Sequence, residues 1–118
     1  MAITLEVAGT VRTADTVRGS NGYAFDLGES LTITEWTRHV LEVADATTDS
    51  AVNFGGVSTA KLVAIESDGA VTVKVSGGTT AIPVNKHLLI TASSSGPTSL
   101  TISNASGATR TVEFLIGG

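Results

Sequence analysis

The chain contains no cysteine, and only 4% of its 118 residues are aromatic. The absence of cysteine excludes disulfide bonds, thiolate chemistry and zinc sites with cysteine ligands. The two histidines, His39 and His87, lack the spacing that metal-binding motifs use. We therefore expect a domain without a metal ion or cofactor, which is stabilised by packing and by contacts with neighbouring subunits.

Charged residues are also scarce, at 15%, and the formal net charge is −4. Lysine and arginine are scattered along the chain, whereas sequence-independent binding to nucleic acid needs clustered positive charge. No run approaches the roughly 20 apolar residues of a membrane-spanning helix. The first six residues lack the basic and apolar segments of a signal peptide. We expect no nucleic-acid or membrane partner, and synthesis in the cytoplasm without export.

Valine, isoleucine, leucine, alanine, threonine and serine make up much of the sequence, and the β-branched residues among them favour strands. Apolar and polar residues alternate over 3–7, 71–75 and 109–116, and turn residues separate such segments. About eight short strands result, which is typical of a sandwich or small barrel. The sequence predicts one all-β domain. It comprises an N-terminal strand and flexible arm or loop at 1–22, and an antiparallel β-sandwich of jelly-roll or immunoglobulin-like type at 23–118.

Turn residues join two pairs of these predicted strands. Asp68-Gly69 lies between 61–66 and 71–75, and the turn from Asn104 to Gly107 lies between the last two strands. Asp-Gly between alternating segments is among the strongest hairpin signals, so we predict that each pair forms a hairpin. The expected core residues of these strands and of 87–91 are Leu62, Ile65, Val73, Leu89, Leu100, Ile102, Val112 and Phe114.

Residues 35–46 are ambiguous between a helix and a strand. Apolar residues recur at helical spacing from Trp36 to Val43, whereas Leu41 and Val43 share one face of an extended strand. The density of threonine and valine favours the strand. The overlapping polar segment 45–50 predicts a turn.

No arrangement of side chains in the sequence indicates catalysis. Ser58 in Gly56-Val57-Ser58-Thr59-Ala60 superficially matches a nucleophile elbow, but that motif requires a strand that turns into a helix. Asp45, Asp49 and Asp68 fit backbone contacts in turns better than a calcium-binding loop. We expect that the protein is not an enzyme and has no catalytic, cofactor-binding or metal-binding residues.

Apolar residues near the N-terminus and the single tryptophan are the candidate interface residues. Ile3, Leu5 and Val7 share one face of the first predicted strand, which fits an arm that packs on a neighbouring subunit. Trp36 fits a core position or a subunit interface better than a binding-face anchor, because such rings are usually buried.

The C-terminal half of the chain resembles small β-structured virion proteins of tailed bacteriophages, namely head decoration (cement) proteins and short tail or neck accessory proteins. The resemblance rests on strands rich in threonine, serine, valine and glycine, on the absence of cysteine and on the acidic balance. The segments that carry it are Thr59-Ala60-Lys61-Leu62, Val71-Thr72-Val73-Lys74-Val75, Leu100 to Gly107 and Val112-Glu113-Phe114. It implies a non-enzymatic structural protein of the virion, a homo-oligomer that binds and stabilises the capsid lattice. Its partner would be the major capsid protein or another virion protein. A phage tail or receptor-binding accessory protein is the alternative, and a cell-surface adhesion module is a third interpretation.

Overall fold

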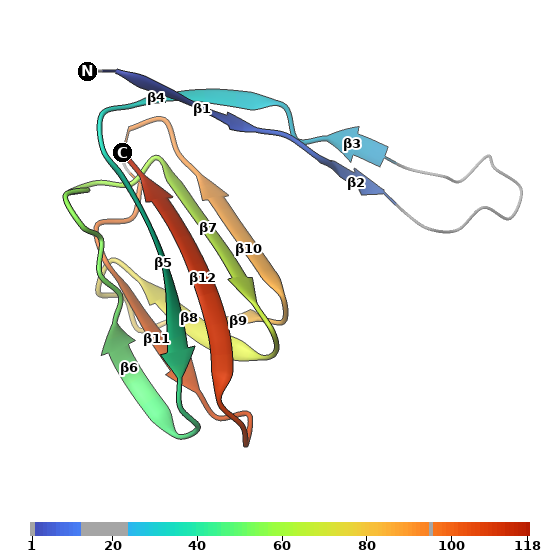
Figure 1. Cartoon of the computed structure of the whole chain (residues 1–118), viewed down its shortest axis with the longest axis vertical. Coiled ribbons are helices and arrows are strands. Elements are labelled where there is room, and N and C mark those ends of the chain that lie inside the picture. Colours follow the sequence, from blue (N-terminus) through green and yellow to red (C-terminus); the bar gives the residue numbers. More distant parts are fainter. Residues whose placement is uncertain (1, 13–23, 95) are drawn as a thin grey trace, which may run out of the picture.

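The computed structural model describes residues 2–12, 24–94 and 96–118. Within these residues all regular secondary-structure elements are β-strands. Strands β5 to β12 form two four-stranded antiparallel sheets, which confirms the predicted β-sandwich (Figure 1). The remaining four strands pair with one another near the N-terminus. The bounds of the strands are β1 Ile3–Val7, β2 Thr10–Arg12, β3 Ala24–Asp26, β4 Glu29–Ile33, β5 Trp36–Val43, β6 Thr47–Ala51, β7 Leu62–Ser67, β8 Val71–Val75, β9 Ile82–Val84, β10 His87–Thr91, β11 Leu100–Asn104 and β12 Arg110–Gly117.

The order of the strands in the sandwich is that of a jelly roll. The first sheet has the order β10-β7-β12-β5, and the second sheet has the order β6-β11-β8-β9. Every connection from β5 to β12 crosses from one sheet to the other, except the one between β8 and β9. This arrangement of eight strands in two sheets selects the jelly roll from the two sandwich types that the sequence allowed.

Both predicted hairpins are wrong, although their strands exist. β7 pairs with β10 and β12 in the first sheet, whereas β8 pairs with β9 and β11 in the second sheet. Likewise, β11 and β12 lie in different sheets. A type I′ hairpin turn needs positive φ at both central residues, and neither Asp68 nor Gly69 has one. Instead, the Asp68 N–H donates a 3.2 Å hydrogen bond to the carbonyl of Thr111 on β12.

The buried side chain of Asn104 closes the crossing from β11 to β12. Its Nδ2 donates to the carbonyl oxygens of Val43 and Ala108, each at 2.8 Å. Its Oδ1 accepts from the backbone N–H of Ser106 at 3.0 Å and from the Ser106 hydroxyl at 2.7 Å. One amide therefore ties the end of β5 to the turn that carries the chain between the sheets.

The main core lies between the two sheets. Seven of the eight predicted core residues are buried, and Leu89 is the exception at 41% exposure. β10 is an edge strand on which Leu88 and Ile90 pack against the core, so Leu89 points outward. The buried residues of the main core are Val43, Val52, Phe54, Val57, Ala60, Val63, Ile65, Val71, Val73, Val84, Leu100, Ile102, Val112, Phe114 and Ile116.

The ambiguous segment forms the eight-residue strand β5, which confirms the strand interpretation. The predicted turn at 45–50 is wrong in most of its length, because β6 begins at Thr47. β6 is an edge strand whose side chains are exposed or half-buried, so it lacks apolar alternation. Backbone pairing with β11 makes it a strand.

Strands β1 to β4 form an N-terminal ribbon that extends from the end of the sandwich near the C-terminus (Figure 1). β1 pairs with β4, and β2 pairs with β3. Between the two pairs, the Leu27 N–H donates to the Gly9 carbonyl at 2.8 Å. The predicted boundary after residue 22 and the predicted flexible loop fall within 13–23, which lies outside the described residues.

Candidate interaction surfaces

A small apolar cluster fixes the N-terminal ribbon to the sandwich. Gly117 on β12 allows the close contact, because a Cβ at this position would lie 2.8 Å from Leu5 Cδ1 and 3.0 Å from Ile33 Cδ1. The ribbon therefore rests directly on the backbone of the first sheet. The cluster consists of buried Leu31, Ile33 and Leu62 and of partly buried Ile3, Leu5, Val7 and Leu115.

Polar contacts fix the same end of the ribbon. The Lys61 ammonium group donates to the carbonyl of Thr32 on β4 at 2.9 Å. The Thr34 and Glu35 N–H groups both donate to the Gly118 carbonyl, at 2.8 and 3.0 Å. The chain is thus held on both sides where β4 passes into β5, and this fixes the direction in which the ribbon leaves the sandwich.

The four sequence-predicted interface residues lie toward one end of the molecule. Ile3, Leu5 and Val7 are half-buried and contact the cluster of their own chain. Trp36 is 52% exposed, so the core alternative for this residue is wrong. Its register partner on β12 is Gly117, which places the indole beside the base of the ribbon. The subunit interface remains a prediction for all four residues.

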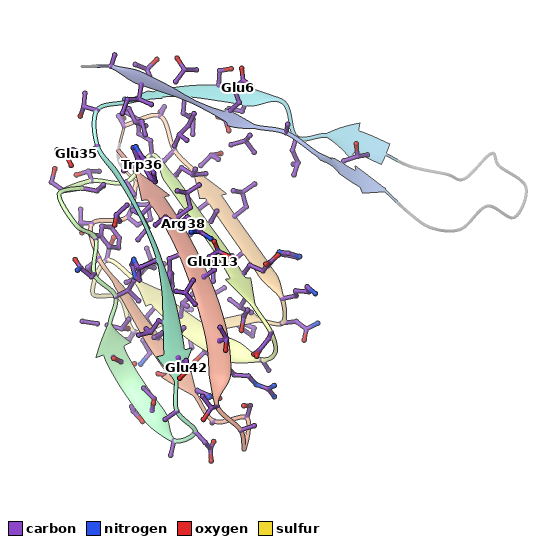
Figure 2. All side chains as sticks on the ribbon, in the orientation of Figure 1. Glu6, Glu35, Trp36, Arg38, Glu42 and Glu113 are labelled. Atoms are coloured by element: carbon purple, nitrogen blue, oxygen red, sulfur yellow. The ribbon has the colours of Figure 1, made fainter. Side chains whose placement is uncertain are left out.

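Trp36 also begins a row of outward-facing side chains along β5, in which Arg38 and Glu42 follow (Figure 2). Val40 shares this face by its position in the strand. Val40 is 55% exposed, and Arg38 forms an ion pair with Glu113 on β12. Glu42 makes no hydrogen bond or ion pair with any described residue. The exposed tryptophan and valine share one face of an edge strand, a location suited to contact with another chain.

A groove of about 430 Å³ separates part of the ribbon from the outer face of the first sheet. Leu27 of the ribbon lines it, together with Leu89 and Leu115 of the sheet. The Arg38–Glu113 ion pair also lines the groove, as do His87 and Glu66, whose Nδ1 and Oε2 atoms lie 3.7 Å apart. The groove combines an apolar lining with exposed polar and charged side chains, and this combination suits a protein segment as an occupant.

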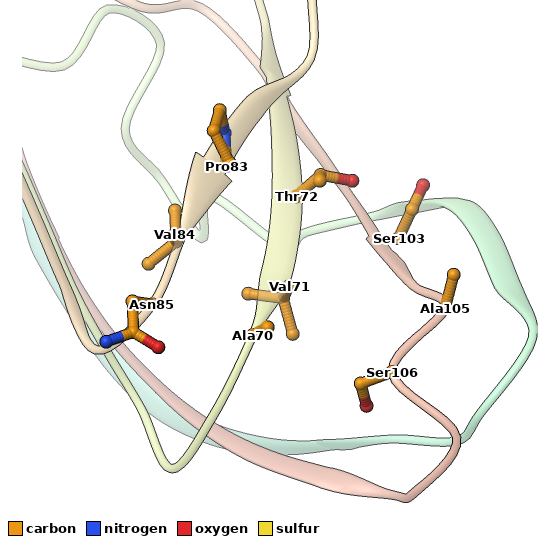
Figure 3. A pocket seen from close by; sticks show the side chains of 9 residues that line it. All are labelled: Ala70, Val71, Thr72, Pro83, Val84, Asn85, Ser103, Ala105 and Ser106. Atoms are coloured by element: carbon orange, nitrogen blue, oxygen red, sulfur yellow. The ribbon is translucent and has the colours of Figure 1, made fainter.

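A second hollow of about 400 Å³ lies beside β8, β9 and the end of β11 (Figure 3). Its side chains are mostly apolar, with hydroxyl and amide groups as the polar ones. None of the described residues that line it is titratable, so it offers binding contacts without an acid–base group. The lining residues are Ala70, Val71, Thr72, Pro83, Val84, Asn85, Ser103, Ala105 and Ser106.

Most of the residues weighed for chemistry have other contacts within the fold. The His39 ring stacks on the buried Phe114 ring at a centroid distance of 5.2 Å. Asp49 pairs with Lys74 at 3.1 Å, and Asp68 accepts from the Thr111 N–H at 3.2 Å. Within 2–12, 24–94 and 96–118, no group of three histidine, aspartate or glutamate side chains could hold a metal ion. A membrane-spanning helix is absent from the same residues.

Sequence reasoning did not identify Val40 and Leu89 as exposed apolar residues. For Val40 a signal was available. Once 36–43 is read as a strand with Leu41 and Val43 facing inward, Trp36 and Val40 must face outward. For Leu89 a signal was also available, because it lies between His87 and Thr91 on one face of the strand, whereas Leu88 and Ile90 share the other face.

Comparisons of the chain with protein-family models, with curated proteins and with solved structures give no significant match. Inferences about function therefore rest on the sequence and on these surfaces.

Proposed function

We propose that this protein is a non-enzymatic structural component of a bacteriophage virion, which binds and stabilises the capsid lattice as a decoration protein. One observation carries the proposal: a β-ribbon extends from a jelly-roll sandwich, and the apolar side chains at its base are only half-buried by their own chain. The resemblance of the C-terminal half to phage virion proteins supports the same proposal.

A decoration protein must contact many equivalent sites on a repeating surface. The sandwich supplies a rigid body, and the ribbon supplies reach, since residues 3–12 span about 30 Å when extended. An oligomer that touches several lattice subunits gains avidity, so each single contact can be weak.

The chemistry of the candidate surfaces indicates how such binding would depend on salt. The ribbon base offers apolar side chains, and Arg38 and Glu113 beside the groove form an ion pair within the chain. Contacts of this kind depend on apolar burial and shape more than on net charge. We therefore expect binding to persist at high salt.

The test is co-sedimentation with undecorated capsids, assembled from the major capsid protein encoded nearest to the gene for this chain. The matched variant replaces residues 10–26 with Asn-Gly, which shortens the ribbon, keeps β1 and β4 and favours a tight turn. We expect the natural chain to sediment with capsids at low and high salt. The shortened variant should unfold at a similar temperature and bind at least roughly tenfold more weakly.

Equal binding by both proteins would show that residues 10–26 do not carry the contact, because the shortened variant keeps the apolar base of the ribbon. Failure of the natural chain to bind capsids, combined with binding to tail assemblies or host glycans, would favour the tail or receptor-binding accessory protein. Binding that is lost at moderate salt would contradict the apolar character of the contact.

A further inference from the structure

One backbone edge of β5 is open among the described residues. The Glu35 N–H donates to the Gly118 carbonyl at 3.0 Å, and the Gly118 N–H donates to the Glu35 carbonyl at 2.9 Å. Bonded and non-bonded pairs alternate along antiparallel strands, so the odd-numbered residues of β5 bond to β12. The backbone N–H and C=O groups of Trp36, Arg38, Val40 and Glu42 therefore point to the open side.

The other three sheet edges of the sandwich are shorter, and two of them have features that block pairing. β9 has three residues and contains Pro83, which lacks an N–H. β6 has an irregular register and a positive φ of 47° at Asp49. β10 has five residues. β5 has eight residues in an uninterrupted register, without proline, glycine or a bulge, so it is the edge best suited to pair with another strand.

The outward side chains of β5 have a self-complementary charge pattern around Val40. In an antiparallel pair of two copies with Val40 opposite Val40, Arg38 of each copy lies opposite Glu42 of the other. A register centred on His39 would place Arg38 opposite Val40 and Trp36 opposite Glu42. Only the first register pairs the free carboxylate of Glu42 with a cation and keeps the valines together.

We propose that β5 pairs with β5 of a second copy of this chain, so that the two first sheets join into one eight-stranded sheet with a two-fold axis at Val40. Such an interface uses the same surface on both copies and closes after two chains. It is small, so the association should be weak and depend on concentration. This inference goes beyond the proposed function and does not depend on it.

A disulfide at the axis tests the register directly, because the natural chain has no cysteine. Opposed residues of a hydrogen-bonded antiparallel pair have Cα atoms about 5.5 Å apart, within the range of roughly 4.4 to 6.8 Å that a disulfide spans. Val40→Cys should form a covalent dimer under mild oxidation. The matched control is Ser50→Cys, an exposed position on edge strand β6, which should stay largely monomeric. Equal cross-linking of the two variants would overturn the proposal.

Charge reversal tests the same interface without a covalent bond. Glu42→Arg removes no contact that the structure shows, yet places like charges opposite each other twice, so sedimentation equilibrium should show dimerisation weakened roughly tenfold or more. Arg38→Glu should also dimerise weakly. A mixture of the two variants should form a heterodimer, because the two arginines on the edge of the Glu42→Arg chain then lie opposite the two glutamates on the edge of the Arg38→Glu chain.

Glu29→Arg makes the same charge change on exposed β4 and should dimerise like the natural chain. Thermal unfolding of each variant establishes that it is folded before its mass is interpreted. A natural chain that stays monomeric up to roughly 1 mM would overturn the proposal. So would variants that dimerise as the natural chain does.

Discussion

Replacing Asn104 with alanine should strongly destabilise the sandwich, although the residue lies at the very end of β11. Its amide is fully buried and makes four hydrogen bonds within one corner of the fold. Those bonds connect the carbonyl end of β5 with the crossing between the two sheets. Asn104→Ala therefore removes the amide that bonds to the backbone groups of Val43, Ala108 and Ser106, in addition to side-chain volume.

The size of the effect follows from the groups left without partners. The carbonyl of Val43 is bonded in a buried setting, whereas the Ala108 and Ser106 contacts are partly accessible to water. A buried polar group that loses its partner costs roughly 1 to 3 kcal/mol, and the small cavity adds to this. We expect a loss of about 3 to 5 kcal/mol, a large share of the roughly 5 to 15 kcal/mol that stabilises a typical domain.

Chemical denaturation of the natural chain and three variants measures this loss. Ser106→Ala is the matched control, since it removes a partly accessible hydroxyl that contacts Asn104 Oδ1, the Ala108 carbonyl and Arg110 Nε, and it should cost about 1 kcal/mol. Asn104→Asp keeps the shape but loses both N–H donors, so it should cost at least as much as the alanine variant. If Asn104→Ala loses no more stability than Ser106→Ala, the amide does not hold the corner.

Three further substitutions test other parts of the structure. Phe114→Ala should cost about 3 to 5 kcal/mol, because the ring is fully buried and stacks on His39, and an unchanged denaturation midpoint would contradict this. Gly117→Val should displace the ribbon, since a Cβ meets Leu5 Cδ1 at 2.8 Å, and limited proteolysis should then cut the ribbon faster while the sandwich persists. Leu89→Thr should change stability by less than about 0.5 kcal/mol, and a multi-kcal loss would place this side chain in the core.

The sequence was sufficient to predict strands but not their partners. Turn residues between alternating segments look the same whether the chain reverses within a sheet or crosses to the other one. At Asp68 the chain crosses to the other sheet, and the crossing is fixed by Thr111 of β12, which bonds to the Asp68 backbone and carboxylate. At Asn104 the crossing is fixed by a hydrogen bond to the carbonyl of Val43, which is 61 residues away along the chain. Such partners are not visible in a local pattern.

Edge strands explain the remaining differences. β6 has exposed side chains, so its sequence resembles a loop, and only its hydrogen bonds to β11 make it a strand. In β10, Leu88 and Ile90 share the inward face, and Leu89 lies between the polar residues His87 and Thr91 on the outward face. The alternation therefore indicated exposure of Leu89, and the core prediction overlooked it. In the central strand β12, one face is buried, and the alternation of apolar residues correctly placed Val112 and Phe114 in the core.

The candidate site was predictable only in outline. Alternation in the first strand identified the apolar face of Ile3, Leu5 and Val7, but the structure shows that this face lies partly against its own sandwich. The outward position of Trp36 follows from the alternation of the strand, but only after the choice between helix and strand for this segment is made. Sequence alone also gave no sign of the groove, because Leu27 and Leu115 come from opposite ends of the chain.

Imaging of capsids is the most direct test of the proposed role in the virion. Undecorated capsids incubated with the natural chain, and with the ribbon-shortened variant as control, would be reconstructed by cryo-electron microscopy. The proposal predicts sandwich-shaped density at equivalent lattice positions, with the ribbon in contact with a capsid subunit, and little density for the shortened variant. Bare capsids after incubation with the natural chain would contradict it.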